Sequence, residues 1–432
     1  MNKMFAVAVA LFTVAAVPRV WAQEVYQKKE IAVFNLSYYN VAVPSELPVN
    51  LDQAIKDVFV NLGRFTVIGM TYRLGAEDVN QFIDNIKQFK AENAVIPEKV
   101  QMGQEFFTQA DMNKLIGSFI VVIPSVASYT SEIDKSGSFL VRLQTAFSFV
   151  NVETTQTIAQ FTLDTQGIAK EIQDAVQDAV ESVPTSLSFE IRKIPDFQIK
   201  SGILEVHGSE VVFELGRNMG IFVGDQYQVL ESKVLSSGRQ VTEEKGLVLV
   251  RRVDEEVSYA TVLYANSPLA VGDQLREIPL AGADVAAYAR TIVMGASQLA
   301  TSLGLRTTAV RGFYDFRPFL EMEVPLQLVG YAAPYFPFNM SLGGEYNIIL
   351  GRLAVTPRAS LGVGFSVGTV QQETYFRVTR YGGSVGLGMS YLFGSNTRFS
   401  LEGGYTMWLS TDTFYASSYG GVYAGGGISI NF

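Results

Sequence analysis

The 432-residue sequence contains no cysteine and a single histidine, His207. The absence of cysteine excludes disulfides, thiolate metal sites, iron–sulfur clusters and cysteine nucleophiles. One histidine cannot build a metal site that needs several, and His207 stands in the turn-like segment HGSE, where we expect it to be solvated. The sequence also lacks a P-loop, a zinc motif and a nucleophile elbow. We therefore expect a protein that is not an enzyme and uses no cofactor or metal.

Charged residues are scarce as well. They make up 17% of the chain, against roughly 25% in soluble globular proteins, and the formal net charge is −9. An acidic balance argues against nucleic acid as a partner, because nucleic-acid binding depends on basic patches. Beyond residue 22 no apolar run reaches about 18 residues, so the sequence predicts no transmembrane helix.

The first 22 residues resemble a secretory signal peptide. Lys3 supplies the positive start, residues 4–17 form the apolar stretch, and Val20-Trp21-Ala22 provides a cleavage site, so we expect removal near Ala22. An uncleaved N-terminal anchor is the alternative, and the shortness of the apolar stretch favours cleavage. An exported, acidic chain without cysteine is typical of a Gram-negative periplasm or outer membrane.

The composition changes near Leu280. Residues 280–432 contain 23 of the 38 glycines and 24 of the 51 aromatic residues, and no lysine follows Lys245. Their nine arginines and eight acidic residues give a net charge of 9 − 8 = +1. Removal of residues 1–22 takes away Lys3 and Arg19, which leaves −9 − 2 = −11 overall and −12 for residues 23–279. This contrast predicts a domain boundary near Leu280.

The C-terminal segment alternates strictly between apolar and small polar residues. In 353–367 the odd positions are mainly large and apolar, whereas the even positions carry mainly Gly, Ser, Thr or Arg. Eight such segments of 11 to 18 residues predict an eight-stranded antiparallel transmembrane β-barrel in 280–432, since soluble strands average about five or six residues. A soluble β-sandwich is the alternative. The segments are 284–294, 300–310, 316–328, 338–350, 353–367, 376–393, 398–409 and 419–432.

If the apolar face contacts lipid, eight charged residues face the barrel interior. An eight-stranded barrel is just wide enough to be filled by side chains, and unpaired charges there would be costly. We therefore expect ion pairs that plug the barrel, with a proton or ion path as the alternative. The residues are Arg290, Arg306, Glu321, Glu323, Glu345, Arg358, Arg398 and Glu402.

The chain ends in GGGISINF. With Phe432 last, Ile430 two residues before it and Gly427 five before it, this segment resembles the C-terminal β-signal of outer-membrane proteins. The resemblance implies recognition by the barrel assembly machinery and insertion into outer-membrane lipid. With residues 23–279 in the periplasm, the tight turns near 350–352 and 394–397 lie on the inner side.

Residues 23–197 alternate between strand and helix patterns and predict a mixed α/β domain. Apolar residues in LDQAIKDVFVNL recur at helical spacing, and Gly63 follows as a cap. The expected strands are 31–36, 64–69, 118–130, 138–150 and 155–164; the expected helices are 51–62, 76–91, 103–116 and 168 to about 183, the last ended by Pro184.

Several segments carry a family resemblance. The succession IAVFNL, LGRFTVIG, FTQADMNKLIGSFIVVIPSVASY and FLVRLQTAFSFVNVETTQTIAQFTL resembles the CsgG-like fold, which includes the curli secretion lipoprotein and the middle part of the flagellar assembly protein FlgT. Residues 198–279 contain Gly220, Gly224 and Asp225 and a second turn at 271–273. They resemble the small β-barrel C-terminal domain of FlgT-like proteins.

These observations together predict a multidomain outer-membrane protein. Our leading hypothesis is a non-catalytic scaffold or tether for an envelope-spanning assembly, which binds a periplasmic protein whose identity the sequence does not give. A homo-oligomer is compatible with it. The alternatives are a small pore or a component of an export channel, and a surface adhesin acting through the outer loops.

Overall fold

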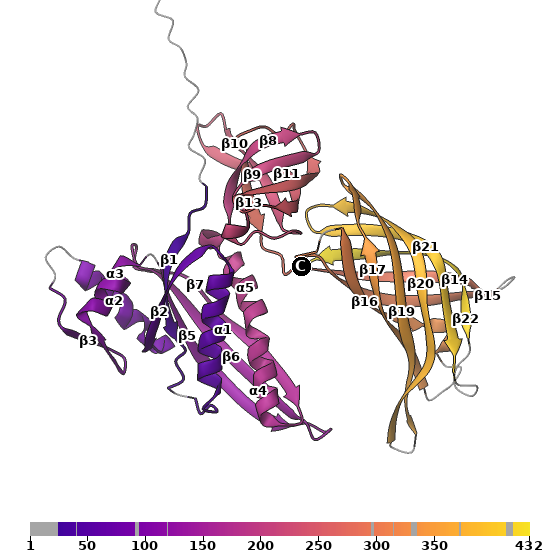
Figure 1. Cartoon of the computed structure of the whole chain (residues 1–432), viewed down its shortest axis with the longest axis horizontal. Coiled ribbons are helices and arrows are strands. Elements are labelled where there is room, and N and C mark those ends of the chain that lie inside the picture. Colours follow the sequence, from indigo (N-terminus) through magenta and orange to yellow (C-terminus); the bar gives the residue numbers. More distant parts are fainter. Residues whose placement is uncertain are drawn as a thin grey trace, which may run out of the picture.

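Three parts follow one another along the chain (Figure 1). The computed structural model describes residues 25–39, 41–90, 95–118, 120–294, 298–313, 315–329, 335–370, 373–411 and 418–432. The first part combines a sheet with helices, the second is a small closed barrel, and the third is a large closed barrel. The expected signal peptide, residues 1–22, lies outside the described residues.

The first part contains a five-stranded sheet. Its strands are β1 (Lys29–Asn35), β2 (Phe65–Arg73), β5 (Ile120–Ile133), β6 (Phe139–Asn151) and β7 (Gln156–Ala169), and a separate hairpin joins β3 (Lys99–Met102) to β4 (Glu105–Thr108). The sheet order is β2-β1-β5-β6-β7. β1 is parallel to both its neighbours, whereas β5, β6 and β7 run antiparallel as two long hairpins.

Helices cover both faces of this sheet (Figure 1). On one face α1 (Leu47–Asn61), α4 (Ile172–Glu181) and α5 (Val183–Lys193) bury a core that includes Phe59, Phe149 and Leu187. On the other face α2 (Val79–Lys90), α3 (Gln109–Gly117) and the β3–β4 hairpin bury a second core around Phe82 and Phe107. The helices thus supply the apolar stripes that the periodicity predicts.

Two helix boundaries differ from the prediction. The expected helix 103–116 is the strand β4 followed by the shorter α3, which starts where the Thr108 hydroxyl accepts a hydrogen bond from the Asp111 amide. Pro184 does not end a helix: it lies in the first turn of α5, where a missing backbone N–H costs nothing. The expected helix from 168 to 183 is therefore the end of β7 followed by α4.

The second part is a closed barrel of six strands. These are β8 (Lys200–His207), β9 (Glu210–Glu214), β10 (Gln226–Val234), β11 (Gln240–Val253), β12 (Val257–Ala265) and β13 (Gln274–Ile278), in the order β10-β11-β12-β9-β8-β13. Its two Gly-Asp turns are built alike. Gly224 and Gly272 have φ of 92° and 94°, and the Asp225 and Asp273 carboxylates each accept a hydrogen bond from the backbone three residues earlier.

The third part is the large barrel. Its strands are β14 (Ala283–Met294), β15 (Gln298–Ala309), β16 (Phe316–Pro325), β17 (Tyr335–Tyr346), β18 (Ile348–Leu350), β19 (Leu353–Val370), β20 (Glu373–Phe393), β21 (Thr397–Ser410) and β22 (Tyr419–Asn431). β17 and β18 pair with the same strand, β19, and form one interrupted strand. β14 pairs with β22, so eight antiparallel strands close the barrel.

Most strand bounds agree with the alternation in the sequence, and β16 is the main departure. The expected strand 316–328 ends at Pro325, after which residues Leu326–Leu328 form a 3-10 turn. Proline lacks the N–H that a strand ladder needs, which accounts for the early end. The longer outer loops are expected at 330–337, 368–374 and 410–418. Residues 335–337, 368–370 and 373–374 instead belong to β17, β19 and β20, and residues 330–334, 371–372 and 412–417 lie outside the described residues.

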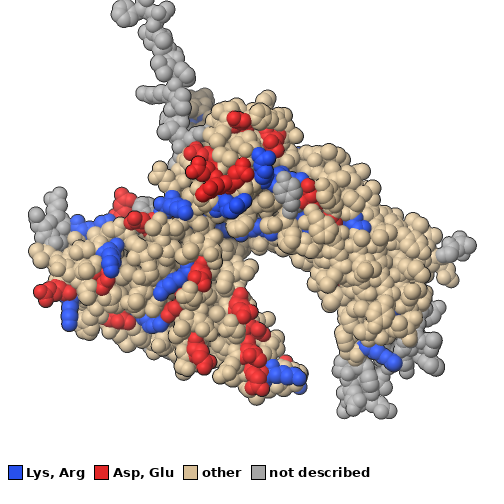
Figure 2. Space-filling model, in the orientation of Figure 1, with Lys and Arg blue, Asp and Glu red and all other residues tan. Residues whose placement is uncertain are grey.

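The outer surface of the large barrel is apolar. Figure 2 shows an almost uncharged surface on this part, whereas charges are spread over the other two. Large side chains from every strand region point outward, and Leu342, Leu361 and Leu401 are each more than 70% exposed. No helix within the described ranges is both long and apolar enough to span a membrane.

Candidate functional site

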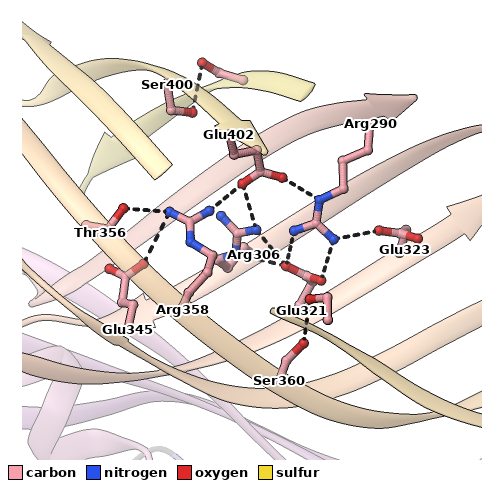
Figure 3. Close-up of polar contacts among 12 residues, drawn as sticks. Arg290, Arg306, Glu321, Glu323, Glu345, Thr356, Arg358, Ser360, Ser400 and Glu402 are labelled. Carbon is pink, nitrogen blue, oxygen red and sulfur yellow. Dashed lines mark hydrogen bonds and ion pairs between the residues drawn. The ribbon is translucent and has the colours of Figure 1, made fainter. Parts of the chain in front are cut away.

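The interior of the large barrel contains a network of buried charges (Figure 3). Strand alternation sends one face of each strand inward, and the inward positions of β14, β15, β16, β17, β19 and β21 carry these side chains. The network joins seven of the eight residues that the sequence analysis singled out. They are Arg290, Arg306, Glu321, Glu323, Glu345, Arg358 and Glu402.

Glu402 is the hub of the network. Its carboxylate accepts hydrogen bonds from the guanidinium groups of Arg290, Arg306 and Arg358, and the Arg306 Nη2 to Glu402 Oε2 distance is 3.2 Å. The Glu402 side chain is only 2% exposed. A carboxylate this deeply buried is stable only because three cations surround it.

A second carboxylate, Glu321, binds two of the same arginines. The Glu321 carboxylate lies 3.0 Å from Arg290 Nη1 and 2.7 Å from Arg306 Nη2. Glu323 lies 3.0 Å from Arg290 Nη1. The rings of Tyr288 and Tyr423 face the Arg290 guanidinium at 4.4 and 4.7 Å, so aromatic faces supply the remaining contacts of this cation.

The network ends at Glu345, and Arg317, which pairs with Glu345 there, was not among the interior residues predicted from the sequence. Arg317 Nη2 lies 2.5 Å from Glu345 Oε1, and Arg358 Nη2 lies 3.6 Å from Glu345 Oε2. Arg317 shares the odd parity of Glu321 and Glu323 on β16, so the alternation could have identified it. With Arg317 the network contains four arginines and four glutamates, and its charges balance.

Arg398 lies outside this network. It stands at the start of β21, four residues before Glu402, and is half-buried. Within the described part of the chain it forms no ion pair, and its Nη1 atom has no hydrogen-bond partner. Parity correctly assigns Arg398 to the face of Glu402, but its position near the strand end keeps it from the centre.

Small residues make room for these long side chains. Gly304 on β15 lies opposite Tyr288 on β14, and a Cβ atom at position 304 would lie 2.2 Å from the Tyr288 ring. The lumen is therefore filled by interlocking arginines, glutamates and aromatic rings. Chemically, this arrangement resists the passage of ions, because a permeating ion would have to break several charge-assisted hydrogen bonds at once.

Exposed aromatic residues of a few strands lie toward each end of the apolar band. At the end near the small barrel lie Phe316, Tyr346, Tyr391, Phe393 and Phe399, and toward the other end lie Phe336, Phe376 and Tyr381; each is at least 47% exposed. Ten residues separate Tyr381 from Tyr391 along β20. At about 3.3 Å per residue and a tilt of about 40°, this spacing spans about 25 Å, the height of the apolar band of transmembrane barrels.

A second buried cluster lies where the three parts meet. Glu277 of β13 binds Arg64 at 2.8 Å and Arg192 of α5 at 2.6 Å, and Arg192 also reaches Asp225 at 3.3 Å. Arg311, in the turn after β15, lies 2.8 Å from the same Asp225 carboxylate. We call these five residues the junction cluster, because each of the three parts contributes to it.

The electrostatics of the junction cluster favour the ionised carboxylate. Burial by itself raises the pKa of Glu277, but the guanidinium groups of Arg64 and Arg192 outweigh it and lower the pKa to about 2. The Ile199 amide also donates a hydrogen bond to this carboxylate, at 3.1 Å. Glu277 is therefore charged at neutral pH and fixes the first part against the small barrel.

Further contacts hold the small barrel against one rim of the large one. Leu247, Leu249 and Leu263 of the small barrel pack on Leu392 of β20. The Arg352 guanidinium lies 3.7 Å from the centre of the Tyr264 ring, and Arg251 forms an ion pair with Asp315. The small barrel thus meets the end of the large barrel at which the turns 351–352 and 394–396 lie.

The remaining residues of types that occur in catalytic or metal sites do not form such a site within the described ranges. His207 lies at the end of β8, is 63% exposed and contacts Glu205 at 2.7 Å. Within the described ranges, no group of three or more histidine, aspartate or glutamate residues is arranged to hold a metal ion.

Comparisons with known proteins yield fold likenesses only. No family model and no curated protein matches the sequence. Similar solved structures include Neisserial surface protein A (16% identity, 35% of this chain and 97% of that one, TM-score 0.26). They also include the N-terminal β-barrel domain of Pseudomonas aeruginosa OprF (14% identity, 35% of this chain and 96% of that one, TM-score 0.23). A third is a major outer membrane protein from Thermus thermophilus (14% identity, 35% of this chain and 99% of that one, TM-score 0.23).

Proposed function

We propose that the protein is a closed outer-membrane anchor that holds a non-catalytic scaffold in the periplasm. In this proposal the large barrel inserts in the outer membrane with Phe432 as part of its assembly signal. Residues 23–279 project into the periplasm, where they bind a protein of an envelope-spanning assembly. The observation that carries the proposal is the junction cluster, because a buried network of ion pairs shared by three parts holds a domain in one orientation.

The barrel geometry supports the membrane placement. An apolar outer face with exposed aromatic residues toward both ends is the expected surface of a transmembrane barrel. In water, an exposed apolar surface of this extent would drive association. The small barrel lies at the end of the tight turns, which is the periplasmic end in outer-membrane barrels.

The filled lumen supports an anchor rather than a transporter. Four arginines and four glutamates span the interior from β14 to β21, and Glu402 alone joins three arginines. A pore would require these pairs to separate. A surface adhesin that acts through the outer loops is the alternative function, and it would not require the junction cluster.

The two periplasmic parts are proposed to be CsgG-like and FlgT-like modules. Support comes from the sequence segments that resemble these families, from the parallel β1–β2 pair next to the long β5–β7 hairpins, and from the six-stranded closure of the small barrel. Modules of this kind would contribute protein-binding surfaces rather than a reaction.

The test combines localisation, conductance and cross-linking in cells. We expect the protein to fractionate with the outer membrane, to migrate differently on gels with and without heating, and to show no steady conductance in planar bilayers. A photo-reactive residue on the exposed face of α1 should capture a periplasmic protein. Recovery in the soluble fraction would contradict the anchor, and a steady large conductance would move the function toward transport.

A further inference from the structure

A groove of about 300 Å³ opens beside the junction cluster at the inner rim of the large barrel. All three parts line it: the end of α1 and the first turns of α5, Phe222 of the small barrel, and Leu280, Ala281 and Arg311 of the large one. The groove is not needed for the anchor or the scaffold, so its shape requires its own explanation.

The groove combines apolar walls with positive charge. Phe189 and Phe222 supply apolar surface, and Ser188 supplies a hydroxyl. The charged residues among its described lining are Arg192 and Arg311, with no acidic residue. Arg192 uses its guanidinium on Glu277, Asp225 and the Leu280 carbonyl, whereas Arg311 has donor capacity left.

The Arg311 side chain is held in place by contacts that leave part of its guanidinium without a hydrogen bond. Its Nε donates to Asp225 at 2.8 Å, and its guanidinium stacks on the Phe222 ring at 4.5 Å. Its Nη2 atom is buried and has no hydrogen-bond partner among the described residues. The Arg311 side chain as a whole is 23% exposed, so an anionic oxygen in the groove can approach the guanidinium from its exposed side and pair with its charge.

The position of the groove indicates where such an oxygen comes from. Arg311 lies in the turn between β15 and β16, and Phe313 in the same turn is 41% exposed. Phe316, the first residue of β16, is one of the exposed aromatic residues at the end near the small barrel and is 62% exposed. The groove therefore adjoins the lipid-facing surface at the depth where aromatic residues meet phospholipid headgroups.

We infer that the groove binds the headgroup of an anionic phospholipid of the inner leaflet, with the phosphodiester on Arg311 and the glycerol end against Phe189 and Phe222. The inference rests on the proposed outer-membrane placement. The bound lipid adds a fourth component to the junction, so the membrane itself helps to set the orientation of the periplasmic part. Arg rather than Lys suits this role, since its planar fork can bind Asp225 and phosphate together.

The test uses the full-length protein in lipid nanodiscs made of phosphatidylcholine with a minor fraction of phosphatidylglycerol. Native mass spectrometry then counts the phosphatidylglycerol that stays bound after mild detergent washing. We expect retention by the wild type and about tenfold weaker retention by Arg311→Gln, as for the loss of a hydrogen bond to a charged group. Arg352→Gln is the matched control, because Arg352 lies at the same rim but outside the groove.

A second variant separates binding from folding. Ala281→Trp fills the groove from an exposed position without changing any charge, and it should also lose the lipid. Equal retention by wild type, Arg311→Gln and Ala281→Trp would overturn the inference, and so would a wild type that inserts but retains no phosphatidylglycerol. Loss of the bound phosphatidylglycerol when inorganic phosphate is added would assign the groove to free phosphate instead. Failure of the wild type to enter nanodiscs would contradict the membrane placement itself.

Discussion

Arg306 and Glu402 lie three strands apart around the large barrel, yet their side chains meet in the lumen with 3.2 Å between Nη2 and Oε2. The contact crosses the barrel interior instead of following the ladder between neighbours. Together with the Arg290 and Arg358 contacts of Glu402, it braces the wall from inside. The stability of the barrel should therefore depend on this interior network. The orientation of the other two parts should depend on the junction cluster.

Replacement of the hub should destabilise the barrel. Glu402→Leu leaves three arginines without their shared carboxylate, and loss of one partner of a buried pair costs about 3–5 kcal/mol. Glu323→Leu should cost less, because Arg290 keeps Glu321 and Glu402. Urea unfolding in lipid vesicles, followed by the gel shift between folded and unfolded protein, measures both. An equal loss in the two variants would contradict the hub role.

Deletion of Phe432 should impair barrel closure. The Phe432 amide donates to the Ala283 carbonyl at 2.9 Å, and its carbonyl accepts from the Gly282 amide at 2.8 Å. Removal of the residue therefore breaks two backbone bonds between the first and last strands. The heat-modifiable fraction in the outer membrane reports on closure. Phe432→Ala keeps both backbone bonds, so a defect in that variant isolates recognition of the aromatic side chain.

Residues 23–279 should fold without the large barrel. The two cores of the first part and the core of the small barrel consist only of residues between 26 and 275. Loss of Leu392 uncovers Leu247, Leu249 and Leu263, so we expect a soluble monomer at low concentration and weak self-association above it. Circular dichroism and sedimentation velocity test this. An unfolded or insoluble fragment would place the boundary elsewhere.

Acid should loosen the junction cluster. The pKa of Glu277 falls from an ordinary value of 4.5 to about 2 in the folded chain, so its contribution is fully present above about pH 4.5. It is lost as the pH falls toward 2, and the full contribution is about 3 kcal/mol. Distances between spin labels on α5 and the small barrel should broaden within this pH window. Glu277→Gln should show broad distances already at pH 7, and a wild type that is unchanged down to pH 2 would contradict the prediction.

The sequence predicted whether a side chain points into or out of the barrel better than it predicted the position of that residue along the barrel axis. Period-2 alternation assigns Glu345, Arg358 and Arg398 to the lumen, because parity alone decides inward or outward. Strand tilt and register decide which inward residues meet at the centre, and these depend on pairing between distant segments. For this reason Arg398 stays apart and Arg317 joins the network, although both sit at inward positions.

The junction cluster had no signal in the sequence. Arg64, Arg192, Asp225, Glu277 and Arg311 come from segments up to 247 residues apart, and each by itself resembles a surface charge. Burial and pairing arise only after three parts have packed against one another. Local patterns predict local elements, and they do not extend to this contact. Pro184 is a smaller case, since the same residue can end one helix or begin the next.

The pairing of β14 with β22 sets the order in which the molecule is completed. The cores of the first two parts consist of residues that precede Leu280, whereas β14 completes the large barrel only by pairing with the last strand of the chain. Arg311 and Leu392 reach the small barrel only as the large one takes shape. The orientation of the first two parts relative to the large barrel therefore depends on closure of the large barrel. If the large barrel stayed open, the first two parts would be folded but would not be held in one orientation relative to it.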